Sequence, residues 1–397
     1  MPHREWNPKS FFRHLTADAL DALQEWAGVE LQLDGDGPVY EQMYRAWKAL
    51  PEKERQRLET ELLPVNDMCA PHARSYLEQL APLVWTNGTS QLVEESRTWS
   101  AQDLAVRLFT ADQKRFADAH QTYAVDMMEH FKEYHGRYAV TLAPTPAAKA
   151  WMKQAMAGHF RDTAFGARCQ VEDFANQEKF ALFVFHEDEV APFDRFNDEG
   201  VVEPDWQRPV IRLAAVFQFE TSTLLVKAPR KPEREKLRDL FAEIFVRDLE
   251  YFEDASKSPK FCFDPLRDSE FDFPTRGADK IDEVSIVRID AKPAHADVRR
   301  IIVEMKPGLS IEGVRMVLAE HGVDLGTDAI QGVRLQFRFE GKGRSRFRTV
   351  SLFNPNSSNL RDTDRDRLIR RYLKEWGIDA SGRREAVEAA ALETAAQ

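Results

Sequence analysis

A cluster of basic side chains is the clearest chemical signal in the sequence. Between residues 331 and 371 there are 11 Lys or Arg against 4 Asp or Glu. In the segment VRLQFRFEGKGRSRFRTVSLF, apolar residues alternate with polar ones, which predicts a strand with one buried and one charged face. The connection GKGR leads into a return strand, and this hairpin would bring six basic residues to one edge: Arg334, Arg338, Lys342, Arg344, Arg346 and Arg348.

This basic hairpin is the candidate binding site of the sequence. Closely spaced guanidinium groups suit phosphate oxygens, so the hairpin predicts contact with nucleic acid. A helix predicted at 311–321, directly before the hairpin, would allow a winged-helix-like arrangement with the helix in a groove and the loop on the backbone. The same surface would also suit an acidic protein partner, and charged strand faces protect sheet edges from aggregation. DNA, RNA and an acidic protein surface therefore stay open as partners.

The segment IIVEMKPG contains a possible catalytic pattern, Glu304 and Lys306 on a predicted strand. Together with an upstream acid, this spacing resembles the PD-(D/E)xK signature of metal-dependent nucleases. Such a site uses two carboxylates to hold Mg²⁺ and a Lys near the attacking water. Charge alternation on a solvated strand face is the alternative explanation.

The upstream acid depends on the predicted pairing of the strands 284–290 and 298–306. If these strands form a hairpin that turns near Ala294, residue 304 lies opposite residue 284. Asp290 is then about 20 Å away along the strand. Asp282 stands at the correct end, so the candidate catalytic residues are Asp282, Glu304 and Lys306.

Other catalytic and ligand-binding motifs are absent from the sequence. It contains no phosphate-binding loop, dinucleotide fingerprint, zinc-protease motif or hydrolase elbow, and we expect no cofactor. The loop LDGDGP begins like a calcium loop, but Pro38 stands where the third oxygen ligand is needed. We therefore expect no resident metal and favour a non-enzymatic binding protein, with the nuclease as the enzymatic alternative.

The elements that position these residues follow from the hydrophobic periodicity. A helical pattern runs to about His135, and Thr145-Pro146 marks a further helix start. Apolar runs near 180–188 and 210–219 predict strands on either side of an acidic loop at 187–205. The fold class is therefore α+β, an N-terminal helical region followed by two mixed segments of antiparallel sheet and helix. The predicted divisions are a helical domain (1–165), an α+β segment (166–253), a linker or surface loop (254–282), a basic ββαββα module (283–378) and an Ala-rich tail (379–397).

The charge is unevenly distributed along the chain. The whole sequence has 55 Lys or Arg and 66 Asp or Glu, a net charge of −11. From Val284 to Ile378 there are 18 basic and 12 acidic residues, so this part carries +6 and the remainder −17. This distribution excludes a protein that coats nucleic acid over its whole surface but permits a local contact through the basic hairpin. We expect the N-terminal helices to contact a protein partner.

The cysteines and the N-terminal residues bear on the compartment. Cys69, Cys169 and Cys262 stand about a hundred residues apart, which builds no disulfide framework. The start MPHREWNPKSFFRHL has no apolar signal region, and no stretch approaches eighteen apolar residues. We expect a cytoplasmic protein that does not enter a membrane.

Overall fold

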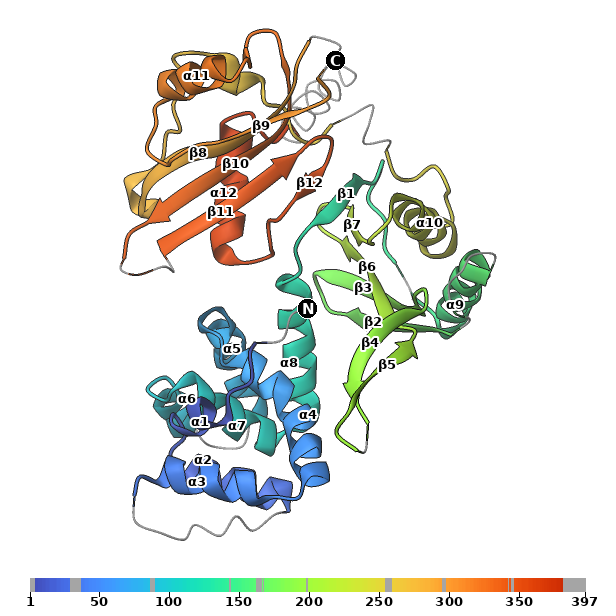
Figure 1. Cartoon of the computed structure of the whole chain (residues 1–397), viewed down its shortest axis with the longest axis vertical. Coiled ribbons are helices and arrows are strands. Elements are labelled where there is room, and N and C mark those ends of the chain that lie inside the picture. The colour runs from blue at the N-terminus through green and yellow to red at the C-terminus, as the bar shows by residue number, and fades with distance from the viewer. Residues whose placement is uncertain are drawn as a thin grey trace. The chain divides into compact units, whose positions relative to one another are not determined.

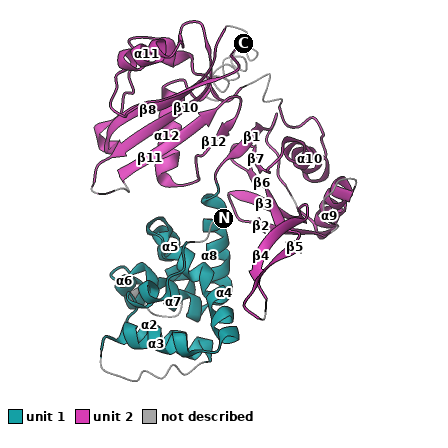
Figure 2. Cartoon of the chain, in the orientation of Figure 1, with its two compact units in different colours: residues 1–128 teal, residues 129–397 magenta. Residues whose placement is uncertain are grey.

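The chain forms two compact units in the computed structural model, residues 1–128 and 129–397 (Figure 2). The first unit is helical, and the second is built on one large antiparallel sheet with helices, which confirms the α+β class. The structure describes residues 4–28, 37–85, 90–142, 144–161, 166, 168–197, 199–253, 259–294, 298–341, 343 and 346–380.

Amphipathic helices build the first unit. Thr16, Ser100 and Asp112 begin three of them, each accepting a hydrogen bond from the backbone N–H three residues further on. The apolar stripes of the helices meet in one core, which includes Phe12, Met43 and Leu62. The helices are α1 (Pro8–Phe12), α2 (Ala17–Ala27), α3 (Val39–Ala49), α4 (Glu52–Met68), α5 (Arg74–Val84), α6 (Ser90–Ser96), α7 (Ala101–Ala111) and α8 (Gln113–Asp126).

One antiparallel sheet organises the second unit. Among the described residues it has ten strands in the order β2-β3-β6-β7-β1-β12-β11-β10-β8-β9 (Figure 1). A separate hairpin consists of β4 (Ala191–Phe196) and β5 (Val202–Gln207). The sheet strands are β1 (Phe131–His135), β2 (Cys169–Ala175), β3 (Lys179–Glu187), β6 (Val210–Gln218), β7 (Thr223–Lys227), β8 (Ile281–Lys292), β9 (Ile301–Glu304), β10 (Ala329–Phe339), β11 (Phe347–Phe353) and β12 (Ser357–Ser358).

The second unit has two hydrophobic cores, one in each half of the sheet. In the first half, α9 (Pro146–Arg161) and α10 (Lys231–Phe241) pack on β3, β6 and β7. In the second half, α11 (Ile311–Glu320) and α12 (Asp364–Glu375) pack on β8, β10 and β11. In β10, residues 333, 335, 337 and 339 point into this core, so the predicted alternation of buried and charged residues is confirmed.

The predicted end of the helical domain at residue 165 is wrong. The structure divides after Met128, and the segment Phe131–His135 is the strand β1 in the second unit. The backbone at His130 has a left-handed φ of 64°, so the chain does not continue as an α-helix into Phe131. Because β1 pairs with both β7 and β12, strand pairing overrides the local helical pattern. The helix predicted from Pro146 is confirmed as α9, but it also belongs to the second unit.

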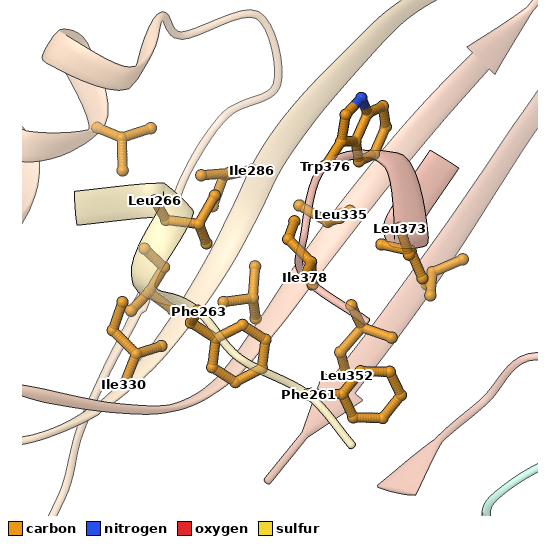
Figure 3. Packing of buried hydrophobic residues seen from close by; sticks show 14 of the residues in the cluster. Phe261, Phe263, Leu266, Ile286, Ile330, Leu335, Leu352, Leu373, Trp376 and Ile378 are labelled. Carbon is orange, nitrogen blue, oxygen red and sulfur yellow. The ribbon is translucent and has the colours of Figure 1, made fainter. Parts of the chain in front are cut away.

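The predicted linker or surface loop at 254–282 contains no α-helix or strand in its described residues 259–280, but its first part is buried and not a linker. Phe261, Phe263 and Leu266 are buried in the core of the second half, together with Leu335, Leu352 and Trp376 (Figure 3). The Pro, Asp and Ser residues of this segment predict a loop, but the burial of its three large apolar side chains holds it against the core. Residues 254–258 lie outside the described residues.

The C-terminal helix begins and ends as its sequence predicts. Thr363 accepts a hydrogen bond from the Asp366 N–H at the start of α12, and Gly377 adopts a φ of 70° beyond its end. The chain then continues to Asp379, which is buried and bridges to Phe261. Residues 381–397 of the predicted tail lie outside the described residues.

Replacing Phe261 by Ala should lower the free energy of unfolding by about 3–5 kcal/mol, because the buried ring leaves a cavity. Phe193→Ala is the matched control, since this ring of β4 is 46% exposed, and it should change the free energy by less than about 0.5 kcal/mol. Urea unfolding measures both variants. Equal effects of the two substitutions would contradict the burial of the 259–266 segment.

Candidate functional site

The second half of the sheet has one face without a helix among the described residues, which we call the uncovered face. The apolar side chains of α11 and α12 join the core on the opposite face. The strand register places polar rows on the uncovered face, because directly paired residues of neighbouring strands point to the same side. It consists of Glu283, Ser285, Arg288 and Asp290 of β8, Gly332, Arg334, Gln336 and Arg338 of β10, and Phe347, Thr349, Ser351 and Phe353 of β11.

Arg334 and Arg338 of the predicted binding site both lie on this uncovered face. Arg338 donates to Glu283 at 2.8 Å and lies 3.7 Å from a carboxylate oxygen of Asp282. Arg334 contacts the Glu304 carboxylate at 3.6 Å and Ser351 Oγ at 3.3 Å. Both arginine side chains are more than one-third exposed. Their charges are thus balanced by neighbouring acids, although they remain accessible to solvent.

The other predicted basic residues do not join them. Arg348 pairs with Phe337, so it points to the helix-covered face, where it donates to Asp366 at 2.7 Å and to the Asn359 carbonyl at 2.6 Å. The Arg346 guanidinium lies 4.6 Å from the centre of the Phe347 ring. Lys342 and Arg344 lie outside the described residues. The structure therefore does not bring the six predicted residues together, because strand alternation separates Arg348 from Arg334 and Arg338.

The basic hairpin is also not a free edge. β10 pairs with β8 and β11 pairs with β12, so both strands lie inside the large sheet. The preceding helix α11 buries Ile311, Val314 and Leu318 against this sheet. Neither strand projects as the winged-helix-like prediction requires.

The candidate catalytic residues Asp282, Glu304 and Lys306 are not assembled. Glu304 pairs with Arg288, not with residue 284, so Asp282 lies six residues away along β8. That separation is about 20 Å. Asp282 contacts Arg338, whereas Lys306 is exposed beyond the end of β9. The observed register differs from the predicted one because β8 continues to Lys292. The turn between β8 and β9 therefore lies closer to the C-terminus than the predicted turn near Ala294.

The observed register also corrects the exclusion of Asp290. This residue pairs with Ile302, two residues from Glu304 on the same face. Arg288 lies between the two carboxylates, at 2.8 Å from Asp290 and 3.5 Å from Glu304, and Arg300 also donates to Asp290. Burial alone would raise the pKa of the Asp290 carboxyl, but hydrogen bonds from Arg288 and Arg300 lower it below its usual value. This arrangement is an ion-pair network and not a pair of metal ligands.

A pocket opens beside this network, at the end of the uncovered face nearest β12. Its volume is about 510 Å³. Phe353 forms part of its wall and lies over Gly332, where a Cβ atom would be 2.3 Å from the ring. Two amide side chains, one guanidinium and the Asp290 carboxylate supply its polar groups. The pocket is lined by Pro259, Asp290, Arg300, Gln331, Phe353, Asn354 and Pro355. Local sequence patterns do not indicate Gln331 and Phe353, because only the pairing of distant strands brings β10 and β11 beside Asp290.

A buried ion cluster lies around Glu133 of β1. Lys260 contacts the Glu133 carboxylate, Arg370 of α12 lies 3.4 Å from it, and Asp379 lies 3.7 Å from Lys260. Burial alone would raise the pKa of Glu133, but Lys260 and Arg370 lower it from 4.5 to about 2. The cluster joins three regions that are distant in the sequence, around Glu133, around Lys260 and between Arg370 and Asp379, which no local pattern indicates.

The chain matches no protein-family model, and the search of curated proteins gave no match. Within the part of the chain that the structure describes, no helix is long and apolar enough to span a membrane. The same residues contain no group of three His, Cys, Asp or Glu side chains that could hold a metal ion.

Glu133→Gln should destabilise the protein by about 3 kcal/mol at neutral pH, because it leaves Lys260 and Arg370 without their buried carboxylate. The pKa of Glu133 is lowered in the folded state, so its stabilising contribution is complete above pH 4.5 and is lost as the pH falls toward about 2. Urea unfolding of both proteins across this range should therefore show the difference shrinking in acid.

The control for this prediction is Glu250→Gln, whose side chain is 82% exposed and which should have little effect at any pH. A loss of stability in Glu133→Gln that is the same at neutral and acidic pH would contradict the assignment.

Proposed function

We propose that the second unit binds single-stranded nucleic acid on its uncovered face. The observation that carries this proposal is the pocket beside Phe353, which continues into a row of arginines. Ligand pockets commonly have volumes of about 300–1,000 Å³, so a pocket of about 510 Å³ is large enough for one nucleobase. Gln331 and Asn354 supply amide groups that can donate to and accept from a base edge.

Two phenylalanine rings on the uncovered face support base stacking. Phe353 lies at the pocket, and Phe347, which is 39% exposed, lies six residues away on the same face of β11. The distance between these positions is about 20 Å along the strand, enough for a few nucleotides. Stacking on aromatic side chains contributes about 1–3 kcal/mol per base and tolerates any sequence.

The arginines between the two rings would contact phosphates. Arg334 and Arg338 are held by exposed or half-exposed carboxylates, and such surface ion pairs contribute only about 0–1 kcal/mol each. A phosphate can therefore replace a carboxylate as the partner of either guanidinium at small cost.

The balance of charge favours a single strand over a duplex. Four arginines of this region, Arg288, Arg300, Arg334 and Arg338, contact four acids, Asp282, Glu283, Asp290 and Glu304. A face without net positive charge gains little from counterion release, which supplies much of the affinity for duplex DNA. Stacking and base contacts then remain as the main sources of affinity, and these need unpaired bases.

A protein partner for the N-terminal helices stays a prediction. Among the described residues of the first unit, the exposed large hydrophobic side chains are Val39 and Leu83, on α3 and α5. Two isolated side chains do not form an apolar patch.

Phe347→Ala should weaken the binding of a labelled single-stranded oligonucleotide about tenfold, because a stacking ring is lost. Arg334→Ala together with Arg338→Ala should weaken it by a similar factor, whereas Arg168→Ala, with a side chain that is 90% exposed, should have no effect. Fluorescence anisotropy at low salt measures all three, with DNA and RNA strands and with duplex DNA as a competitor.

The salt dependence provides a second readout for the same proteins. Two or three phosphate contacts predict that the logarithm of the association constant falls by about 1–2 for each log unit of salt. Absence of binding at low salt, preference for the duplex, or equal binding by the Phe347→Ala variant would each overturn the proposal.

A further inference from the structure

The hairpin β4–β5 stands apart from the large sheet. Its strands pair with each other and belong to a separate two-stranded sheet (Figure 1). The sequence indicated only an acidic loop at 187–205, because the strands are short and contain Pro192 and Pro204. A two-stranded hairpin on its own is only marginally stable in water. Large apolar side chains that such a hairpin leaves exposed are therefore not explained by its own folding.

The register separates the hairpin into two different faces. On the charged face, Arg195 lies 3.4 Å from Glu203 and 3.6 Å from Asp205. On the other face, Phe196 is 73% and Trp206 is 66% exposed. This apolar face consists of Pro192, Asp194, Phe196, Val202, Pro204 and Trp206, and Asp194 is its one charged residue. Exposed Trp and Phe side chains that share one face of a hairpin are typical of a protein interface.

A second copy of the chain is a poor occupant of this face. Six residues per strand make a face about 20 Å long and about 10 Å wide, or roughly 200 Å². A stable interface needs about 800 Å² on each partner, so two such faces stacked together would be too small. Pairing through the strand edges is also disfavoured, because Pro192 and Pro204 lack the N–H that a new strand pair needs. The hairpin gains enough contact only if a partner encloses it on several sides.

The charge around the apolar face restricts the partner further. Between residues 191 and 207 there are five acidic residues and one basic one, a net charge of −4. The acids just before the hairpin, Asp188 and Glu189, contact Arg230. The negative charge of the hairpin repels nucleic acid and anionic membranes and complements a basic protein surface.

We infer that β4–β5 is the docking element for a different protein, which receives the hairpin in an apolar groove with Lys and Arg at its rim. Trp206 and Phe196 fill the groove and provide most of the affinity, as large aromatic anchors do at interfaces. The acidic side chains of the hairpin contact the basic rim. This contact is independent of the uncovered face.

The test uses the full chain with a photoreactive phenylalanine analogue at Trp206 or, as the opposite-face control, at Phe193. Irradiation in the cells that encode the chain should give one protein adduct from position 206 and none from position 193. The adduct is identified by mass spectrometry, and that protein is then purified. Titration calorimetry measures its affinity for the unmodified chain and for surface variants.

Phe196→Ser together with Trp206→Ser should weaken this complex at least tenfold, whereas Phe193→Ser should change its affinity less than twofold. The affinity should also fall as salt is raised, because the rim contact is ionic. An adduct with a second copy of the chain or with lipid, no adduct at position 206, or unchanged affinity of the double variant would overturn it. Thermal unfolding of the variants should be unchanged, since both side chains are exposed.

Discussion

The second unit depends on the buried carboxylate of Glu133. This residue lies in β1, which pairs with β7 of the first half and β12 of the second half. A buried charge without partners costs several kcal/mol, and its partners Lys260 and Arg370 both come from the second half. The central strand is therefore stable only when both halves are folded, so the two cores form a single unit. Across the same junction, the Glu133 N–H donates to the Asn356 carbonyl, and the Asn356 side-chain amide donates to the Glu133 carbonyl.

The same constraint explains why the uncovered face has a fixed shape. Lys260 is followed by Phe261 and Phe263, which pack in the core beneath β8, β10 and β11. Arg370 belongs to α12, whose Asp366 holds Arg348 on the helix-covered side. The ion cluster thus anchors both elements that support the second half of the sheet. The pocket beside Phe353 and the arginine row lie on the other side of these strands.

Local sequence patterns predict much of this fold. The incorrect predictions concern segments whose structure depends on contacts with residues that are distant in the sequence. Alternation in β10 and the capping residue of α12 are properties of short segments, so they could be read from the sequence. The strand β1 could not, because its partners lie about 90 and 225 residues away. For the same reason, the structure does not bring the residues of the predicted sites together. A register that differs by four residues moved Asp290 next to Glu304, and strand alternation separated Arg348 from Arg334.

We propose that single-stranded nucleic acid lies along the uncovered face from Phe353 to Phe347. Ultraviolet crosslinking of an oligothymidylate to the full chain, followed by peptide mass spectrometry, tests it most directly. We expect crosslinked peptides that contain Phe347 or Phe353, and we expect each crosslink to be lost when the corresponding ring is replaced by Leu. Crosslinks confined to α12, to the β4–β5 hairpin or to the first unit would contradict it.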